Sequence, residues 1–90
     1  MTRLQGLPNI GPVLAQRLEK AGIASAEEFL ALGDEAAFAR LVALYPEDAC
    51  THTRLALAGA ARNTRWMALD RQLRQSLCQG AALKRHRTKT

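Results

Sequence analysis

Cysteine and histidine are the residues of this chain best suited to metal binding or nucleophilic chemistry, but their spacing supports neither. Cys50 and His52 lie close together, whereas Cys78 and His86 are far from them in the sequence. A tetrahedral zinc site needs four ligands, and the neighbourhood of Cys50 supplies no second pair. We therefore expect no metal and no cofactor, and we interpret both cysteines as free thiols.

The carboxylates are also poorly placed for catalysis. Glu27-Glu28 and Glu47-Asp48 are adjacent pairs at predicted helix starts, where negative charge complements the helix dipole. From residue 50 onward the only carboxylate is Asp70, so no serine, histidine and aspartate set can be placed. The sequence has no phosphate-binding loop and no dinucleotide fingerprint. These absences predict a non-enzymatic protein.

The turn Leu7-Pro8-Asn9-Ile10-Gly11 is the first segment that could contact a ligand. An apolar residue followed by glycine before a helix can fill the core while the glycine lets the backbone approach a partner. The N–H groups at the helix start would then face an anion such as a DNA phosphate, with Asn9 and Gly11 as candidate contacts. The alternative is an ordinary turn that fixes the direction of the helix, and the lack of a long preceding helix favours it.

Basic residues are concentrated in the second half of the chain. Residues 1–49 carry four basic and seven acidic groups, whereas residues 50–90 carry nine basic groups and one acidic group. This asymmetry suggests a polyanionic partner, and the alternative is a solvated face. The candidate nucleic-acid contacts in this half are Arg62, Arg65, Arg71, Arg74, Lys84, Arg85, Arg87 and Lys89.

Helices are the elements expected to carry these residues. Alanine and leucine, which favour helix, are abundant, and β-branched residues, which favour strand, are few. The apolar spacing and the capping residues predict five short helices in a compact all-α bundle. Their expected limits are Pro12 to Gly22, Ser25 to Gly33, Asp34 to Pro46, Glu47 to about Arg62, and Asp70 to Gly80. We expect one domain over residues 1–80 and a basic disordered tail over residues 81–90.

The apolar faces of these helices must meet in one core, because isolated helices this short are marginal in water. The predicted core side chains are Ile10, Leu14, Leu18, Phe29, Phe38, Leu41, Leu57 and Trp66, with Trp66 the largest. No apolar run approaches the roughly 20 residues of a membrane span. The N-terminus has no signal-peptide pattern, and two cysteines suit a reducing compartment. We expect a cytoplasmic protein without a membrane partner.

Several segments, in this order, resemble the TfoX C-terminal domain over about residues 4–79. They are Leu7-Pro8-Asn9-Ile10-Gly11-Pro12, Leu18-Glu19-Lys20-Ala21-Gly22-Ile23, Phe29-Leu30-Ala31-Leu32-Gly33, Leu57-Ala58-Gly59-Ala60, Arg62-Asn63 and Arg65-Trp66. The first turn and helix also resemble the helix-hairpin-helix element of DNA-binding proteins. The sequence departs from the TfoX pattern with Ala58 where glutamate is common and Asn63 where glycine is common.

The resemblance implies a five-helix fold related to helix-hairpin-helix domains. It also implies a link to TfoX/Sxy regulators, which activate competence genes for DNA uptake in bacteria. We expect a stand-alone module that binds nucleic acid or assists transcriptional regulation, with DNA or a transcription regulator as partner. The alternative is a protein–protein adaptor without nucleic-acid contact, since residues 1–83 carry nine basic and eight acidic groups. A monomer or a homodimer would suit either function.

Overall fold

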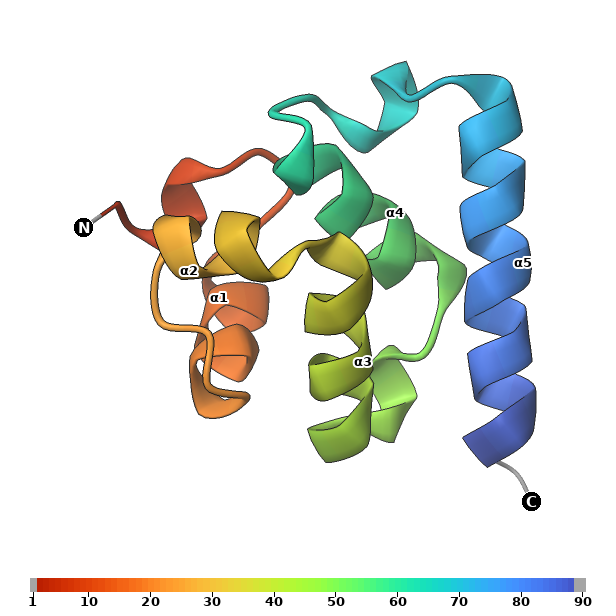
Figure 1. The fold of residues 1–90 in the computed structure, drawn as a ribbon, viewed down its shortest axis with the longest axis horizontal. Helices are drawn as coiled ribbons and strands as arrows, with labels where there is room; N and C mark the ends of the chain where they lie inside the picture. Colours follow the sequence, from red (N-terminus) through yellow and green to blue (C-terminus); the bar gives the residue numbers. More distant parts are fainter. Residues whose placement is uncertain (1, 89–90) are drawn as a thin grey trace.

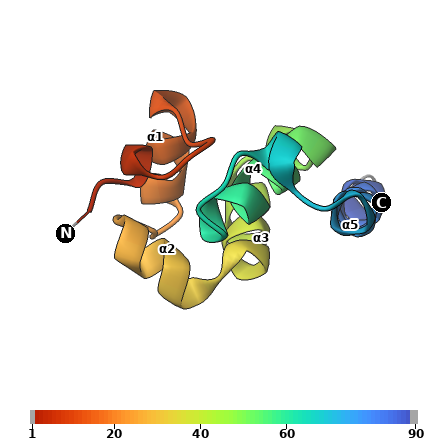
Figure 2. The ribbon, with the colours of Figure 1, turned by 90° about the horizontal axis from the view of Figure 1, so that it is seen from above.

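The computed structural model describes the backbone of residues 2–88 and the side chains of residues 2–79. This part of the chain is all-α, as predicted, and contains no strand. Its helices are α1 (Pro12–Lys20), α2 (Ala26–Leu32), α3 (Asp34–Leu44), α4 (Thr51–Ala61) and α5 (Arg71–Thr88), with single 3₁₀ turns η1 (Leu4–Gly6), η2 (Pro46–Asp48) and η3 (Trp66–Ala68). Figures 1 and 2 show α1 and α2 on one side, α5 on the other, and α3 and α4 between them.

Two helices end in the same left-handed turn, and the sequence predicts both ends. After α1, Gly22 has a φ of 90°, and Ile23 N–H donates to the carbonyl of Leu18. After α4, Asn63 has a φ of 54°, and Thr64 N–H donates to the carbonyl of Gly59. These bonds form Schellman motifs, which satisfy carbonyls left open at a helix end.

The start of α2 confirms the predicted cap in part. The Ser25 hydroxyl accepts a hydrogen bond from Glu28 N–H at 3.2 Å, as a capping box requires. The Glu28 carboxylate instead accepts from Ala24 N–H, one residue further back than expected. At the start of α3 the predicted cap is wrong, because Gly33 occupies the cap position and Asp34 is the first helical residue.

The limits of the last two helices also differ from the prediction. Glu47 and Asp48 form η2, and α4 begins only at Thr51. Because Pro46 favours a tight turn, the chain completes a 3₁₀ turn before the helix starts. The predicted end of the last helix at Gly80 is wrong, because α5 continues through residues 81–88 of the expected disordered tail. Alanine and leucine after Gly80 are strong helix formers and offset its cost of about 1 kcal/mol.

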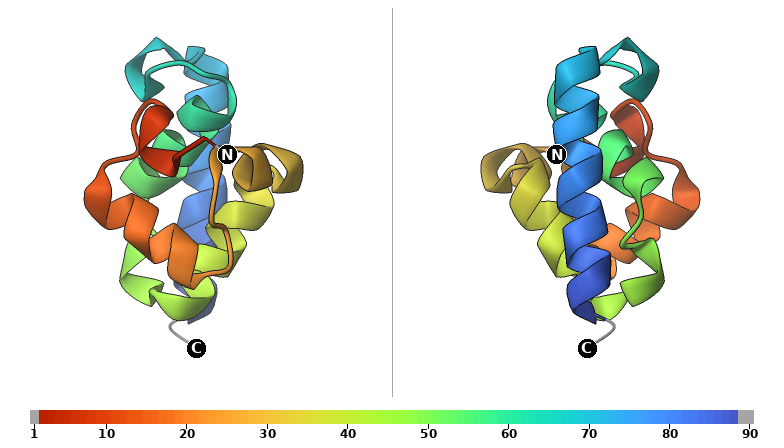
Figure 3. Two further views of the ribbon diagram at one scale, coloured as in Figure 1. Left: turned by 90° about the vertical axis from the view of Figure 1, so that its left-hand side faces the viewer. Right: turned by 90° about the vertical axis from the view of Figure 1, so that its right-hand side faces the viewer.

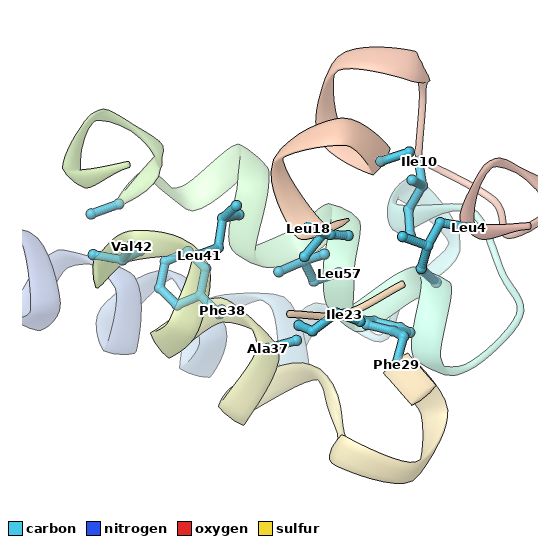
Figure 4. Close-up of a cluster of buried hydrophobic side chains, with 13 residues drawn as sticks. Leu4, Ile10, Leu18, Ile23, Phe29, Ala37, Phe38, Leu41, Val42 and Leu57 are labelled. Carbon is cyan, nitrogen blue, oxygen red and sulfur yellow. The ribbon is translucent and has the colours of Figure 1, made fainter. Parts of the chain in front are cut away.

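The main core gathers side chains from η1, the first turn and α1 to α4, and Figure 4 shows ten of them labelled. Six predicted core residues are buried in it: Ile10, Leu18, Phe29, Phe38, Leu41 and Leu57. Leu14 is partly buried against the same cluster. The predicted anchor Trp66 does not belong to this core, because η3 lies beyond the end of α4 and Trp66 packs against a second cluster. The large, fully buried side chains are instead Phe29 and Phe38.

A second, smaller cluster holds α5 against α4. It consists of Leu55, Ala58, Leu69 and Leu77, with Trp66, Leu73 and Cys78 packed on its edge. Viewed from that side, α5 lies across the middle of the face (Figure 3). Leu57 faces the main core while Leu55 faces α5, so α4 is covered on two sides, and its residues from Arg54 to Ala60 are all buried. No helix within the described residues is long and apolar enough to cross a membrane.

Candidate nucleic-acid interface

Asn9, a predicted phosphate contact, is bonded inside the protein. Its Nδ2 donates to the carbonyl oxygens of Thr64 at 2.9 Å and Ala56 at 3.4 Å, and its Oδ1 accepts from Trp66 N–H at 3.2 Å. Its φ of 69° is in the left-handed region, which asparagine tolerates better than most residues. The Asn9 side chain therefore ties the first turn to the bend after α4, and these hydrogen bonds occupy both its amide nitrogen and its amide oxygen.

Gly59 makes room for this contact. A Cβ atom at this position would lie 2.5 Å from Asn9 Nδ2 and 2.7 Å from the Thr64 carbonyl oxygen. The groups that approach Gly59 are the Asn9 amide and the Thr64 backbone. Together, Asn9 and Gly59 fix the backbone at Trp66.

The start of α1 opens into a cavity of about 300 Å³. Gly11 is exposed there, but Pro12 carries no N–H, so the first-turn donors belong to Val13 and Leu14. The same cavity is lined by Arg17 and Asp48, whose side chains pair at 2.8 Å. The hydrogen bond with Asp48 raises the pKa of Arg17 above its ordinary value. The cation beside this helix start is thus already matched by a carboxylate.

Two arginines of the second half turn towards Asp34. Arg54 is only 7% exposed, donates to Asp34 at 2.6 Å, and lies over the ring of Phe38. Arg62 donates to the Ala58 carbonyl oxygen and lies 3.7 Å from Asp34. The predicted candidate Arg62 is therefore partly committed to a carboxylate of this chain.

Arg71 and Arg74 instead line a groove of about 590 Å³ between α4, η3 and α5. We call it the α4–α5 groove, and its lining residues are Leu55, Trp66, Arg71, Arg74, Gln75, Cys78 and Gln79. Among the described residues, the ion pairs involve Arg17, Arg54 and Arg62, and neither Arg71 nor Arg74 takes part in one. Arg74 Nε is buried and has no hydrogen-bond partner in the described part of the chain.

The remaining predicted contacts fall into two groups. Arg65 is exposed and directly precedes Trp66, a residue of the groove, in the sequence. Arg65 forms no ion pair with the residues in the range 2–79. The side chains of Lys84, Arg85, Arg87 and Lys89 lie outside the described residues. The structure thus places Arg71 and Arg74 in one groove, with Arg65 beside Trp66 of that groove in the sequence. Asn9, Gly11 and Arg62 lie outside this groove.

Trp66, Gln75 and Gln79 line the groove but are not among the candidate contacts predicted from the sequence. A signal for the two glutamines was present, because Arg71, Gln75 and Gln79 repeat every four residues and must share one helix face. Trp66 could not be placed in this way, because its position depends on the Asn9 contact across 57 residues. Within the described part of the chain, no three His, Cys, Asp or Glu side chains gather in a way suited to a metal ion.

The arrangement is that of a small all-α module with a cationic groove. A family model for the TfoX C-terminal domain matches residues 1–81, and the chain belongs to this family. The predicted family is thereby confirmed. No curated protein matches the sequence.

Two solved structures from Listeria monocytogenes are similar to this chain. An uncharacterized protein in a triclinic crystal form is 39% identical, with a TM-score of 0.76 over 82% of this chain and 83% of that one. A protein of unknown function in a tetragonal form is 36% identical, with a TM-score of 0.81 over 89% of this chain and 96% of that one. These similarities support the fold, and they carry no activity with them.

Proposed function

We propose that this chain is a non-enzymatic module that binds the backbone of a nucleic acid through the α4–α5 groove. The observation that carries the proposal is the charge of the groove, whose lining includes Arg71 and Arg74 and no carboxylate among the described residues. Three other cavities lined by described residues each contain carboxylates: Asp48, Glu28, and Asp34 with Glu35.

The chemistry of these cations suits phosphate. Arginine presents planar donors that match phosphate oxygens, and contacts with phosphates position a protein without reading sequence. Arg65 is exposed and directly precedes Trp66 in the sequence, so it adds a further positive charge close to the groove. The membership in the TfoX C-terminal domain family supports a regulatory setting linked to competence and a cytoplasmic location. A loss of competence-gene expression when the gene is deleted would test the regulatory part.

Binding of fluorescently labelled oligonucleotides at two salt concentrations tests nucleic-acid contact. Three phosphate contacts predict a fall in affinity of roughly 20-fold for a single strand and roughly 40-fold for a duplex between about 50 and about 200 mM salt. The double variant Arg71→Gln/Arg74→Gln should bind more weakly and with a shallower dependence on salt. Arg40→Gln is the control, because Arg40 is exposed on α3, away from the groove. Equal affinity of wild type and double variant, or no binding at low salt, would show the proposal to be wrong.

A second candidate function, a protein contact, is supported by the cavity beside α1. Val13 is 63% exposed at this cavity, and Pro12, Leu14 and Ala56 add apolar lining. Exposed apolar surface of this kind suits a side chain from a protein partner. Val13→Glu should abolish such a contact and leave oligonucleotide affinity unchanged, which separates the two functions in a single variant.

A further inference from the structure

We propose that the α4–α5 groove takes a single-stranded nucleic acid, with one base stacked on Trp66 and neighbouring phosphates bound by Arg71 and Arg74. This inference rests on the proposed nucleic-acid contact and specifies the form of the nucleic acid. It starts from a residue of the groove that phosphate binding leaves unexplained, the half-buried Trp66.

Trp66 is held in place before any ligand arrives. Its backbone N–H donates to Asn9 Oδ1, and its ring meets the ring of His52 edge to face, with centroids 5.6 Å apart and planes at 82°. The ring packs on the cluster that joins α4 to α5, yet it also lines the groove. A fixed aromatic ring at the side of a groove is a stacking platform that loses little entropy on binding.

The other lining residues complement a base and its phosphates. Arg74 lines the groove beside Arg71, and a guanidinium group can donate to phosphate oxygens. Gln75 and Gln79 follow on the same face of α5, and each amide both donates and accepts hydrogen bonds. An aromatic ring flanked by cations in one groove is the combination by which single strands are bound with little sequence preference.

A duplex does not fit this arrangement equally well. In a duplex the base faces are covered by their neighbours, and only base edges are presented in the grooves. A duplex could therefore use Arg65, Arg71 and Arg74 but not the ring of Trp66. An acidic peptide could likewise use the arginines, but it offers no flat ring to stack.

The sole tryptophan of the chain allows a direct test with the full-length protein. Its intrinsic fluorescence is followed while three ligands of equal length are added: a thymidine oligonucleotide, an abasic strand with the same number of phosphates, and a duplex. We expect the thymidine strand to quench the fluorescence and to bind about tenfold more tightly than the abasic strand, because one base is stacked. The duplex should bind more weakly than the thymidine strand and cause little quenching.

A pair of variants assigns the difference to the ring. With labelled strands, Trp66→Leu should bind thymidine and abasic strands equally while keeping the salt dependence of the wild type. Trp66→Phe keeps an aromatic ring and should retain part of the preference, which guards against an effect of misfolding. Helix content measured by circular dichroism confirms that both variants are folded.

The outcomes separate this inference from the proposed function. Equal binding of thymidine and abasic strands by the wild type, or tighter binding of the duplex, would overturn the single-strand inference and leave the backbone contact standing. Binding of none of the three would overturn both. A competition with polyglutamate at matched ionic strength tests an acidic protein as the ligand. If polyglutamate bound more tightly than the thymidine strand and displaced it, both the inference and the proposed function would be overturned.

Discussion

Polar side chains have partners within the protein on one side of α4, whereas the arginines on the other side form no ion pair among the described residues. On the side of α3 and the first turn, Arg54 is paired with Asp34, and Asn9 is bonded to the bend after α4. On the side of α5, Arg71 and Arg74 have no ion pair among the described residues. Residues of the same type thus hold the fold together on one side and are open to a ligand on the other. The partner of an arginine, rather than its presence, distinguishes the two roles.

The strongest test of the paired side removes Arg54. Arg54→Met leaves Asp34 without its 2.6 Å partner in a mostly buried position, so we expect a loss of about 3 kcal/mol in the free energy of unfolding. Urea denaturation measures it. Arg62→Gln is the matched control, because Arg62 approaches the same carboxylate only to 3.7 Å and is more exposed, and its loss should stay below about 1 kcal/mol. Equal losses would remove the distinction between the two arginines.

The next largest effect is expected at Asn9. Asn9→Ala removes three hydrogen bonds and places alanine at a φ of 69°, which should cost about 2–3 kcal/mol of stability. Asn9→Gly keeps the backbone freedom and loses only the hydrogen bonds, so about 1 kcal/mol should be recovered. Thermal unfolding of both variants separates the two contributions. If both variants were as stable as the wild type, the contact of Asn9 with the bend would contribute nothing to the fold.

Gly59 tests the same contact from the other partner. Gly59→Ala should destabilise by about 2 kcal/mol, although alanine favours the helix, because its Cβ meets Asn9 Nδ2 and the Thr64 carbonyl. In an Asn9→Gly background the cost should be smaller, since one of the two clashes is gone. A double-mutant cycle measures this coupling. Strict additivity would mean that the two residues do not share one site.

On the open side, the expected effect on stability is close to zero. Arg65→Gln should change the free energy of unfolding by less than about 0.5 kcal/mol, because this side chain is exposed and, within residues 2–79, unpaired. The slope of log affinity against log salt should fall by about 0.7–0.9 if Arg65 binds one phosphate. A loss of stability comparable to that of Arg54→Met would place Arg65 with the paired residues.

The last test concerns an exposed pair far from α4, whose effect is confined to acidic pH. The Glu27 carboxylate accepts hydrogen bonds from Thr2 Oγ1 and Thr2 N–H, which lower the pKa of Glu27 from 4.5 to about 2. Because the folded pKa is the lower one, the contact stabilises the fold above pH 4.5 and is lost as the pH falls towards 2. Glu27→Gln should flatten that part of the stability profile. Glu35→Gln, which removes an exposed carboxylate of α3, is the control and should leave it unchanged.

Local signals carried most of the fold. The helix ends predicted at Gly22, Ser25, Asn63 and Asp70 are confirmed, because capping depends on neighbours within a few residues. The start of α4 was misplaced, since Glu47 suits a 3₁₀ turn as well as a helix start.

The candidate site was less accessible to sequence reasoning. Asn9 looked like a ligand contact because its partners Thr64 and Trp66 lie more than 50 residues away, and no local pattern reveals such a bond. The residue type identifies the arginines, but it does not show that Arg54 is buried and paired with Asp34 whereas Arg71 is exposed and lines the groove. That difference is created by tertiary packing.

The small cluster under α5 has a consequence for the dynamics of the chain. Helix α5 is docked mainly by Leu55, Ala58, Leu69 and Leu77, whereas α4 also belongs to the thirteen-residue main core. Amide hydrogens of α5 should therefore exchange with deuterium through a local opening that costs less free energy than global unfolding. A nucleic-acid strand bound to both Trp66 and Arg74 would hold α5 in place and suppress this local opening. Slower exchange along α5 would therefore report occupancy of the groove without any label on the ligand.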